Sequence, residues 1–593
     1  MAELSVTGAR WIRAENDARI ASGLVQDVGM PQALANILAS RGITREQVAL
    51  WLDPKIRDLM PDPSSLSDMD TAASRLAEAV MAGEKIGVFG DYDVDGACSA
   101  ALIHGVLTSL GVEVSVHIPD RFLEGYGPNL PALMKLKEQG CGLIVTVDCG
   151  ITAHKPVEAA VNSGVEVIII DHHIPGPDLP RVAAVVNPNR LDDDGSLGHL
   201  AAAGVTFLVM VALVRHLRGM GFFDDGREAP DLMAELDLVA LATVADVVPL
   251  TGLNRAFVRS GLAVMGRRQR AGLAALADCG RMDTAPDTHA LGFILGPRIN
   301  AGGRIGQSHL GVDLLIARDT IKAQAIAIEL DQLNTQRRTI DQGVADAAIA
   351  SIPVADGQSA PAFVMAVGED WHQGVIGIAA SRLKDHFNRP AAVVSLISDG
   401  EGRIEGKASA RSIAPFKLGE AIISAVQEGL LLAGGGHDMA AGFTLDPDKR
   451  EAFEASMIAR AEKAFGADGP IRENRVDSGL AAGHCSLDLL TWIDRAGPWG
   501  VGFPEPLFML ENTAINPVRV IGKDGSHRAF RISDATGSVD GVAFRVAGTP
   551  LAEALDGAGD GSRFDLLGRL NRNNFNGREK VQFILTDLRQ SNV

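Results

Sequence analysis

The most informative stretch of the sequence is Val88-Phe-Gly-Asp-Tyr-Asp-Val-Asp-Gly96. The apolar run that begins at Ile86 predicts a buried strand, and helix-like sequence follows from Ala97. Between the strand and the helix lie three alternating carboxylates, Asp91, Asp93 and Asp95. Three acids at the end of one strand repel each other and cost stability unless a cation lies among them. The stretch therefore predicts a metal site at the end of a buried strand.

Two later strands end in residues of the same kind. The further candidates are Asp148 after the run 143–147, Asp171-His172-His173 after the run 165–170, and Asp246 inside the apolar segment 236–248. The segment 66–265 alternates short apolar runs with helical stretches, which predicts a parallel sheet with crossover helices. Ligands bind such sheets beyond the carboxyl ends of the strands, where the strand order reverses. We therefore expect these side chains to meet at one edge of the sheet.

A calcium-binding EF-hand loop also begins with the pattern Asp-x-Asp-x-Asp-Gly, but it needs a glutamate at its twelfth position. That position is Leu102 here, and the pattern follows a strand rather than a helix. The sequence also contains no HExxH and no CxxC. Four or five carboxylates with imidazole suit Mn²⁺ or Mg²⁺, and so many acids fit two ions better than one. The chemistry implied is hydrolysis of a phosphoester without a covalent intermediate.

Length and composition predict a soluble protein of several domains. A chain of 593 residues is too long for one core, and its 46% hydrophobic and 22% charged content is ordinary for globular proteins. The longest apolar stretch, 200–214, is shorter than the ~20 residues of a membrane span, so we expect a buried helix. The N-terminus lacks signal-peptide features, and five scattered cysteines fit a reducing cytoplasm. The net charge of -19 argues against nucleic-acid binding over the whole surface, but not against a local basic channel.

The chain divides into five predicted segments: a helical cap at 1–65, the parallel-sheet domain at 66–265, connecting helices at 266–355, a smaller α/β domain at 356–465, and a linker with a β-barrel at 466–593. The connecting segment contains a predicted long helix over 312–352. Five short runs with β period near the C-terminus suggest an OB-fold. Arginines and phenylalanines in these runs suit a stacking platform for single strands, and equally an ordinary barrel.

Three segments rich in small residues are candidate phosphate-binding loops. They are the stretch 292–306 with Arg298 and Arg304, the stretch 406–412 with Ser409, and the stretch 434–442 with His437. Glycines allow close approach of the backbone, and arginines bind phosphate oxygens in pairs. A structural turn with solvated arginines is the alternative for the first stretch.

These motifs resemble the DHH phosphoesterase superfamily. The matching residues are Gly90 to Gly96, Val147-Asp148-Cys-Gly-Ile151, Asp171-His172-His173 and Ala245-Asp246, in the family's order and spacing. Gly-Gly-Gly-His437 resembles the associated DHHA1 domain, so the fold implied is a DHH domain joined by a long helix to a DHHA1 domain, followed by an OB-fold. The stretches 298–304 and 499–508 are similar to those of the RecJ family of bacterial single-strand-specific 5′→3′ exonucleases.

The resemblance implies a role for each candidate residue. The implied metal ligands are Asp93, Asp95, Asp148, His172 and Asp246, which hold two Mn²⁺ or Mg²⁺ ions. Asp91 is implied to be a ligand or the base that orients water, and His173 is implied to contact the scissile phosphate. The implied substrate-binding residues, which include candidates to grip the terminal 5′-phosphate, are Arg121, Arg298, Arg304, Ser409 and His437.

The function implied is a cytoplasmic, monomeric exonuclease of DNA recombination and repair that releases nucleoside 5′-monophosphates from single-stranded DNA. Single-stranded-DNA-binding protein and a RecQ-type helicase are implied partners, although the sequence contains no docking motif that we recognise. One alternative is a DHH phosphoesterase that acts on nanoRNA or cyclic dinucleotides, which would need no C-terminal barrel to hold a distant strand. Another is a single-strand-binding scaffold that has lost its ions, against which the complete set of acids and histidines argues.

Overall fold

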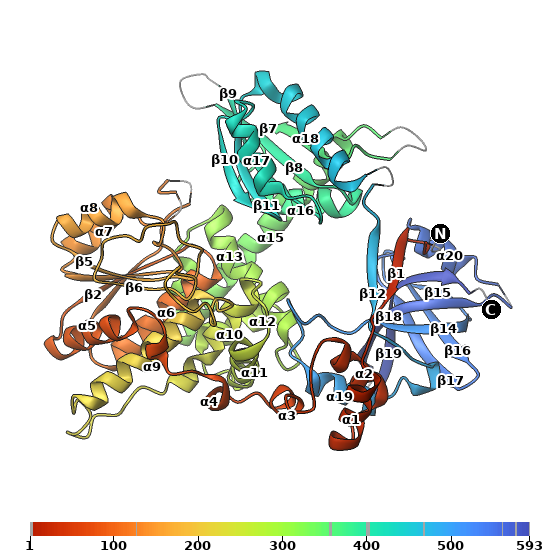
Figure 1. Ribbon diagram of the computed structural model, residues 1–593, viewed down its shortest axis with the longest axis horizontal. Helices are drawn as coiled ribbons and strands as arrows, with labels where there is room; N and C mark the ends of the chain where they lie inside the picture. The colour runs from red at the N-terminus through yellow and green to blue at the C-terminus, as the bar shows by residue number, and fades with distance from the viewer. Residues whose placement is uncertain are drawn as a thin grey trace. The chain divides into compact units, whose positions relative to one another are not determined.

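The computed structural model describes residues 4–121, 123–125, 127–354, 359–398, 404–466, 469–559, 561–575 and 578–591. The chain folds into two compact units. Unit 1 comprises Met1–Val48, Arg337–Ala496 and Glu505–Val593, and unit 2 comprises Ala49–Gln336 and Gly497–Pro504. Figure 1 labels the helices and strands of both units.

A five-stranded parallel sheet forms the centre of unit 2. Its strands are β2 (Ile86–Gly90), β3 (Val114–His117), β4 (Leu143–Val147), β5 (Glu166–Ile170) and β6 (Ala184–Val186). They are ordered β3-β2-β4-β5-β6, so the strand order reverses at β2, which pairs with both β3 and β4. The predicted parallel sheet is confirmed, and the reversal places the expected binding edge at the carboxyl ends of β2 and β4.

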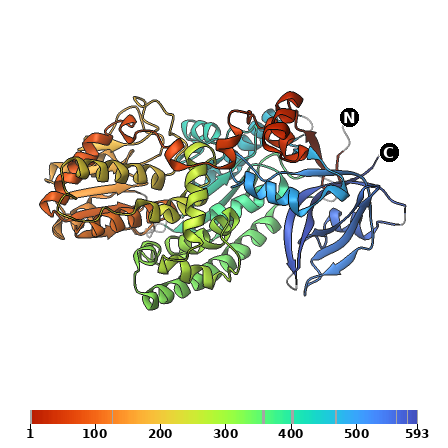
Figure 2. The same cartoon turned by 90° about the horizontal axis from the view of Figure 1, so that it is seen from below.

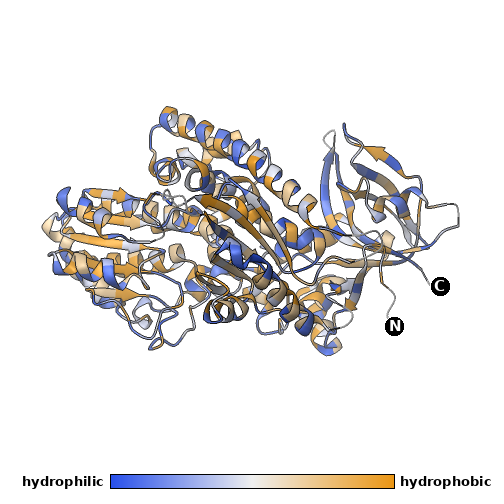
Figure 3. Ribbon diagram, turned by 90° about the horizontal axis from the view of Figure 1, so that it is seen from above, coloured by the Kyte–Doolittle hydropathy of each residue, from blue (hydrophilic) through white to orange (hydrophobic). Residues whose placement is uncertain are grey.

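Helices cover both faces of this sheet (Figures 1 and 2). They are α5 (Met69–Ala82), α6 (Val94–Ser109), α7 (Leu130–Glu138), α8 (His154–Asn162) and α9 (Ala202–Gly219). One face packs against α5, α6 and α9, and the other packs against α7 and α8. Strands β2 and β4 are buried along their whole length, as expected of central strands covered on both faces, and hydrophobic colouring predominates in the sheet (Figure 3). Strand β3 is half-buried, and β5 begins at the exposed Glu166. Helix α9 is long and apolar enough to cross a membrane, but it is 72% buried in this core, as predicted for the apolar stretch 200–214.

The remainder of unit 2 is helical, and two predictions here are wrong. Its helices are α4 (Ile56–Leu59), α10 (Leu236–Ala245), α11 (Gly252–Met265), α12 (Ala271–Cys279), the π-helix η3 (Ala290–Leu295), α13 (Gly296–Ile305), α14 (Leu310–Ile316) and the first part of α15 (Thr320–Ser351), whose residues from Arg337 belong to unit 1. The stretch 292–306 is therefore helix rather than loop, because its glycines allow close helix packing. A Cβ at Gly303 would lie 2.8 Å from the carbonyl oxygen of Tyr92. The predicted long helix is interrupted before Asp319, whose side chain accepts from the amides of Ile321 and Lys322 and so starts α15.

A smaller α/β sheet in unit 1 is ordered β10-β11-β9-β8-β7. Its elements are β7 (Val364–Glu369), α16 (Ile376–Phe387), β8 (Ala391–Ser398), β9 (Ile404–Arg411), α17 (Leu418–Gln427), β10 (Ala433–His437), β11 (Ala440–Leu445) and α18 (Arg450–Phe465). The predicted loops 406–412 and 434–442 are therefore mostly strands, wrongly expected to be loops because alternating small residues give no hydrophobic period.

The C-terminal strands form a seven-stranded sheet that closes through an extra pairing between β14 and β16. Its elements are β13 (Ser478–Gly479), β14 (Phe508–Ile515), β15 (Arg519–Ile521), β16 (His527–Asp534), β17 (Gly537–Ala543), α20 (Pro550–Asp556), β18 (Phe564–Phe575) and β19 (Arg578–Gln590). The predicted barrel is confirmed. Strand β14 is not among the five strands that the sequence predicts.

The N-terminal segment is predicted to be a helical cap, but it also contains a strand. It contains β1 (Ala9–Arg13), α1 (Ala18–Val28), α2 (Gln32–Ser40) and α3 (Val48–Leu52). Strand β1 pairs in parallel with β12 (Arg472–Val476), and α2 contacts α19 (Leu487–Ala496), so this segment adjoins the residues that precede the barrel.

Candidate metal centre

The first three acids lie between β2 and α6, as the sequence predicts. Asp93 caps α6, because its carboxylate accepts from the backbone amides of Asp95 and Gly96 at 2.9 and 3.2 Å. Gly96 is required here, since a Cβ would lie 2.5 Å from the backbone nitrogen of Asp91. Asp91 is 4% exposed, and its Oδ1 has no hydrogen-bond partner in the described part of the chain. An unpaired carboxylate oxygen in a buried site is an available metal ligand.

Asp95 is held by the start of α9. Its two oxygens accept from the backbone amides of Ala202 and Ala203 at 2.6 and 2.7 Å. The positive end of the helix dipole favours a carboxylate at this position. Asp95 is 1% exposed, so these bonds fix a carboxylate that is removed from bulk water.

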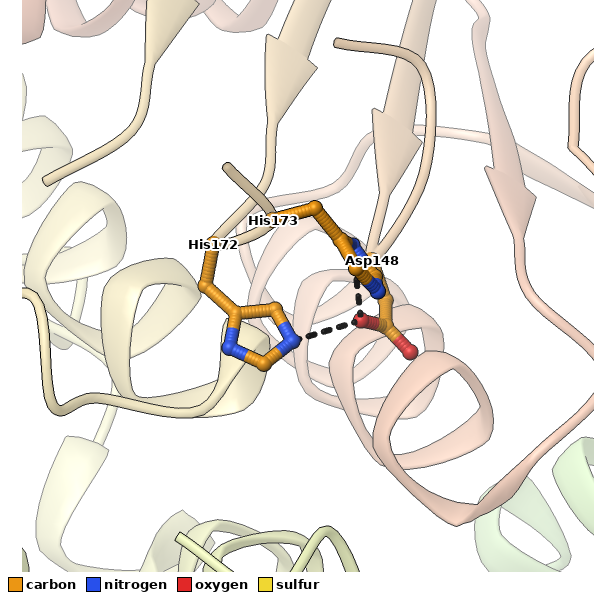
Figure 4. A group of neighbouring side chains, drawn as sticks. All are labelled: Asp148, His172 and His173. Carbon is orange, nitrogen blue, oxygen red and sulfur yellow. Dashed lines mark ion pairs between the residues drawn. The ribbon is translucent and has the colours of Figure 1, made fainter. Parts of the chain in front are cut away.

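Asp148 follows β4 with a positive φ of 59°, which turns the chain sharply after the strand. It is 2% exposed. The Nε2 atom of His172 lies 3.3 Å from Oδ1 of Asp148 (Figure 4). The same atom lies 3.7 Å from Oδ2 of Asp246 and 3.9 Å from Oδ2 of Asp95. The other ring nitrogen of His172, Nδ1, donates to the carbonyl of Leu200 at 3.0 Å. That bond leaves Nε2 as an acceptor that faces three carboxylates, an arrangement that a cation satisfies.

His173 is oriented by Asp171. Its Nδ1 lies 2.7 Å from Oδ1 of Asp171, which also accepts from the backbone amides of His172 and His173. Burial raises the pKa of Asp171, but the hydrogen bond and charge of His173, together with the backbone amides that Asp171 accepts from, outweigh burial, and the pKa is lowered. Burial lowers the pKa of the imidazole, but the hydrogen bond and charge of Asp171, together with the charges of Asp246 and Asp91, raise the pKa of His173 to about 9. The imidazole of His173 is 43% exposed and therefore accessible to a substrate.

The donor atoms fall into three overlapping groups, each with atoms within 4.8 Å of one another. The groups are Asp91, Asp93 and Asp148; Asp95, His172 and Asp246; and Asp148, His172 and His173. Asp246 stands at the C-terminal end of α10, so this donor comes from a helix rather than from the end of a strand. The third group shares Asp148 with the first and His172 with the second, so it links them. The first two groups provide the carboxylate and imidazole ligands expected for two hard to borderline cations.

The electrostatics of the acids agree with this donor set. Burial, followed by repulsion from Asp93, raises the pKa of Asp91 to about 8. Burial and repulsion from Asp95 raise the pKa of Asp246 to about 8. Burial also raises the pKa values of Asp95 and Asp148. Burial is the largest cause for these four acids and repulsion from neighbouring carboxylates adds to it; a bound cation removes that repulsion.

Two of the predicted substrate-binding arginines adjoin the acidic loop. The guanidinium carbon of Arg121 lies 5.2 Å from the ring centroid of Tyr92, which stands between Asp91 and Asp93. Arg304 follows Gly303, the residue of α13 that packs on Tyr92. Burial raises the pKa of the Tyr92 phenol, and Arg121 and Arg304 oppose that rise, so both cations act on this loop.

Arg298 has a different environment. Its Nε lies 2.9 Å from Oδ1 of Asp331, its Nη1 donates to the carbonyl of Ile294, and its side chain is 14% exposed. This pairing ties α13 to α15 and leaves Arg298 less available to a substrate than Arg304.

Ser409 and His437 lie in unit 1, on β9 and β10. Ser409 accepts from the guanidinium of Arg411 at 3.0 Å. Burial lowers the pKa of Arg411, and no carboxylate in the described ranges lies within ion-pair distance of it. A partly buried cation beside a hydroxyl suits an anion. We did not single out Arg411 from the sequence, although it stands two residues from Ser409 and so on the same face of the strand.

Three family models match the chain. They are the DHH family N-terminal domain at 85–243, the DHHA1 domain at 359–463 and the RecJ OB domain at 476–587. The single-stranded-DNA-specific exonuclease RecJ of Bacillus subtilis is 35% identical over 580 residues, which cover 98% of this chain and 70% of the relative. The protein of the same name from Salmonella typhimurium is 36% identical over 575 residues, covering 94% and 96%.

Solved structures agree with these matches. Thermus thermophilus RecJ in complex with Mn²⁺ aligns with a TM-score of 0.80 and 31% identity, covering 98% of this chain and 80% of that chain. The same protein in complex with Mg²⁺ aligns with a TM-score of 0.74 and 29% identity, covering 98% and 79%. With the domain order and the grouped acids, these similarities show that the chain belongs to the RecJ family of single-stranded-DNA-specific exonucleases.

Proposed function

We propose that the chain is a metal-dependent exonuclease that hydrolyses single-stranded DNA in the 5′→3′ direction and releases nucleoside 5′-monophosphates. The observation that carries the proposal is the convergence of five aspartates and two histidines at the reversal point of the sheet, in a member of the RecJ family. The direction of cleavage rests on the family resemblance.

The two donor groups suggest how the ions are held. Asp91, Asp93 and Asp148 would hold one Mn²⁺ or Mg²⁺ ion, and the group formed by Asp95, His172 and Asp246 would hold the other. Asp91 is then a ligand rather than the base, because its buried oxygen has no other partner in the described residues. When bound, two such ions supply a nucleophilic water at neutral pH and neutralise the charge of the phosphate.

The chain's own residues bind and orient the substrate. His173, held through Nδ1 by Asp171, presents its second ring nitrogen to a non-bridging phosphate oxygen and stabilises its charge. Arg121 and Arg304 bind the terminal 5′-phosphate beside Tyr92. Ser409, Arg411 and His437 form the anion-binding face of the second α/β sheet and contact the strand's backbone.

The OB-fold domain supplies the grip on the incoming strand. Arg531 and Arg569 are half exposed on β16 and β18, and Phe544 follows β17 with half of its surface exposed. Such cations and rings bind phosphates and stack on bases without reading sequence.

The biological setting follows from the same membership. A single-strand exonuclease acts on DNA ends that arise during recombination and repair, in the cytoplasm of a bacterial cell. Single-stranded-DNA-binding protein and a RecQ-type helicase are the partners that would supply such strands. We propose that the enzyme works as a monomer.

The test is digestion of long single strands labelled at either end, in Mn²⁺, with a duplex of the same sequence and a dinucleotide as controls. We expect labelled mononucleotide at once from the 5′ label and only late from the 3′ label, with the duplex intact. Faster turnover of the dinucleotide than of the long strand would favour the small-substrate phosphoesterase instead. Digestion that proceeds equally in a chelator would refute a metal-dependent enzyme.

A further inference from the structure

Three large apolar side chains lie exposed in segments that adjoin the metal centre. Ile174 follows His173, Val247 follows Asp246, and Phe293 belongs to the π-helix η3. Their exposed fractions are 70%, 63% and 72%. We call these three residues the apolar rim. A single exposed apolar residue is ordinary, but three in segments that adjoin one acidic centre mark a candidate binding surface, because neither metal binding nor phosphate binding uses them.

The segments that carry the rim meet at the C-terminal end of α10. The 3.7 Å approach of His172 Nε2 to Asp246 Oδ2 joins the loop of Ile174 to that of Val247. A Cβ at Gly292 would lie 3.5 Å from Val244, and one at Gly296 would lie 3.4 Å from Ala245. Phe293 stands between these two glycines. The segments that carry the rim therefore border the centre on the side of Asp246.

Two of the three positions have unusual backbone. Val247 has a φ of 62°, a left-handed conformation that is a genuine outlier for a β-branched residue. Phe293 lies in a six-residue π-helix, and such helices are rare and frequently occur at functional sites. Strain of this kind persists where the surrounding structure holds a residue in place for function.

Phe293 also has a stacking partner. The ring of His289 lies parallel to it, with centroids 4.9 Å apart and an interplanar angle of 26°. The histidine supports one face of the phenyl ring, and 72% of the phenylalanine remains exposed. A supported, exposed aromatic ring is the group on which unpaired nucleobases stack.

We propose that the apolar rim binds the nucleobase adjoining the scissile phosphodiester, with Phe293 as its stacking platform. The inference rests on the proposed exonuclease function. The acids bind the metal ions and the arginines bind the phosphate. The uncharged surface next to them is therefore available to the nucleobase, which has an apolar face. Every base has such a face, which makes the contact independent of sequence. The rim positions the substrate and takes no part in the chemistry.

The test combines two variants with abasic substrates. Phe293→Ala removes the platform, and Val247→Gly removes the side chain while glycine accepts the positive φ. Ile321→Ala is the matched control, since Ile321 is 79% exposed at the start of α15. Each protein receives an intact single strand and strands that lack one base at successive positions from the cleaved end. The measured quantities are kcat and KM in Mn²⁺, and the melting temperature.

We expect Phe293→Ala and Val247→Gly to raise KM for the intact strand roughly tenfold, with kcat changed less and the melting temperature retained. The KM of the wild type should rise by the same factor when the base at one particular position is missing. The KM of Phe293→Ala should not rise further when that base is missing. Ile321→Ala should match the wild type.

A KM equal to that of the wild type in both variants would refute base binding by the apolar rim. The same conclusion would follow if the rise in KM caused by Phe293→Ala and the rise caused by a missing base multiplied at every position. A wild type that degrades no single strand would overturn the exonuclease function itself and the rim with it. The two failures are thus distinct.

Discussion

The Nε2 atom of His172 lies 3.3 Å from Oδ1 of Asp148, close enough for one cation to bind both atoms. Nδ1 already donates to the carbonyl of Leu200, so Nε2 offers a lone pair toward a carboxylate. Asp148 belongs to the donor group of Asp91 and Asp93, and His172 belongs to the donor group of Asp95 and Asp246. We therefore expect a substitution at this pair to weaken metal binding by both groups.

The first prediction concerns Asp148. Asp148→Asn removes a charge from two donor groups at once, so we expect at least a roughly 100-fold loss of kcat on single-stranded DNA. Asp225→Asn is the control, because Asp225 is a half-exposed surface acid paired with Arg227. Steady-state digestion in Mn²⁺ measures both. Equal rates for the two variants would remove Asp148 from the centre.

The second prediction concerns pH. Burial raises the pKa of Asp91 and of Asp246 to about 8, whereas an unfolded aspartate has a pKa of about 3.9. Between these two pKa values the metal-free folded state binds more protons than the unfolded state. Its free energy of unfolding therefore falls as the pH rises from about 4 to about 8. Mg²⁺ binds the ionised acids, so it should raise the melting temperature more at a pH of about 8 than at about 6.

Thermal melts with and without Mg²⁺ at the two pH values measure this effect. The variant Asp91→Asn with Asp246→Asn serves as control and should show a smaller dependence on pH. A larger shift at the lower pH would contradict the assignment of these acids as ligands.

The third prediction concerns the orientation of His173. Asp171→Asn weakens the acceptor that holds Nδ1 of His173 at 2.7 Å. We expect kcat to fall about 10- to 100-fold, with a smaller change in KM. His173→Gln should lower kcat further, and the double variant should resemble His173→Gln alone, because the two residues act as one unit. Independent, multiplying losses would show that Asp171 acts elsewhere.

The fourth prediction separates the two arginines of α13. Arg304→Ala should raise KM about tenfold for a 5′-phosphorylated strand and abolish any preference over a 5′-hydroxyl strand. Arg298→Ala should instead lower the melting temperature, because it breaks the pair with Asp331. Comparing both strands with both variants decides the matter. A loss of phosphate preference in Arg298→Ala alone would reverse the assignment.

Much of the centre is predictable from sequence because its acids directly follow apolar runs. Strands such as 143–147 are apolar throughout, and the residue after each strand must lie at the sheet's edge. Asp148 and Asp171 could thus be placed without coordinates. From its neighbours alone, Asp246 was recognisable only as an acid in an apolar segment, and the family resemblance was needed to identify it as a ligand, because its position depends on how α10 packs on α6.

The glycine-rich segments show where sequence reasoning fails. Glycine usually signals a loop, yet Gly303 belongs to α13 because Tyr92 packs too closely for a side chain. Gly434 and Gly436 lie in β10 for a similar reason, since a Cβ at either would meet neighbouring atoms below 3 Å. The stacked pair of His289 and Phe293 carries no sequence signal, because its π-helix depends on tertiary packing.

The central claim is a two-ion centre, and the most direct measurement is the number of Mn²⁺ ions bound per chain at saturation, by equilibrium dialysis with quantified metal. The account predicts two ions for the wild type, and fewer than two for Asp148→Asn with both sites weakened. One ion per wild-type chain, or two ions with unchanged affinity in Asp148→Asn, would contradict it.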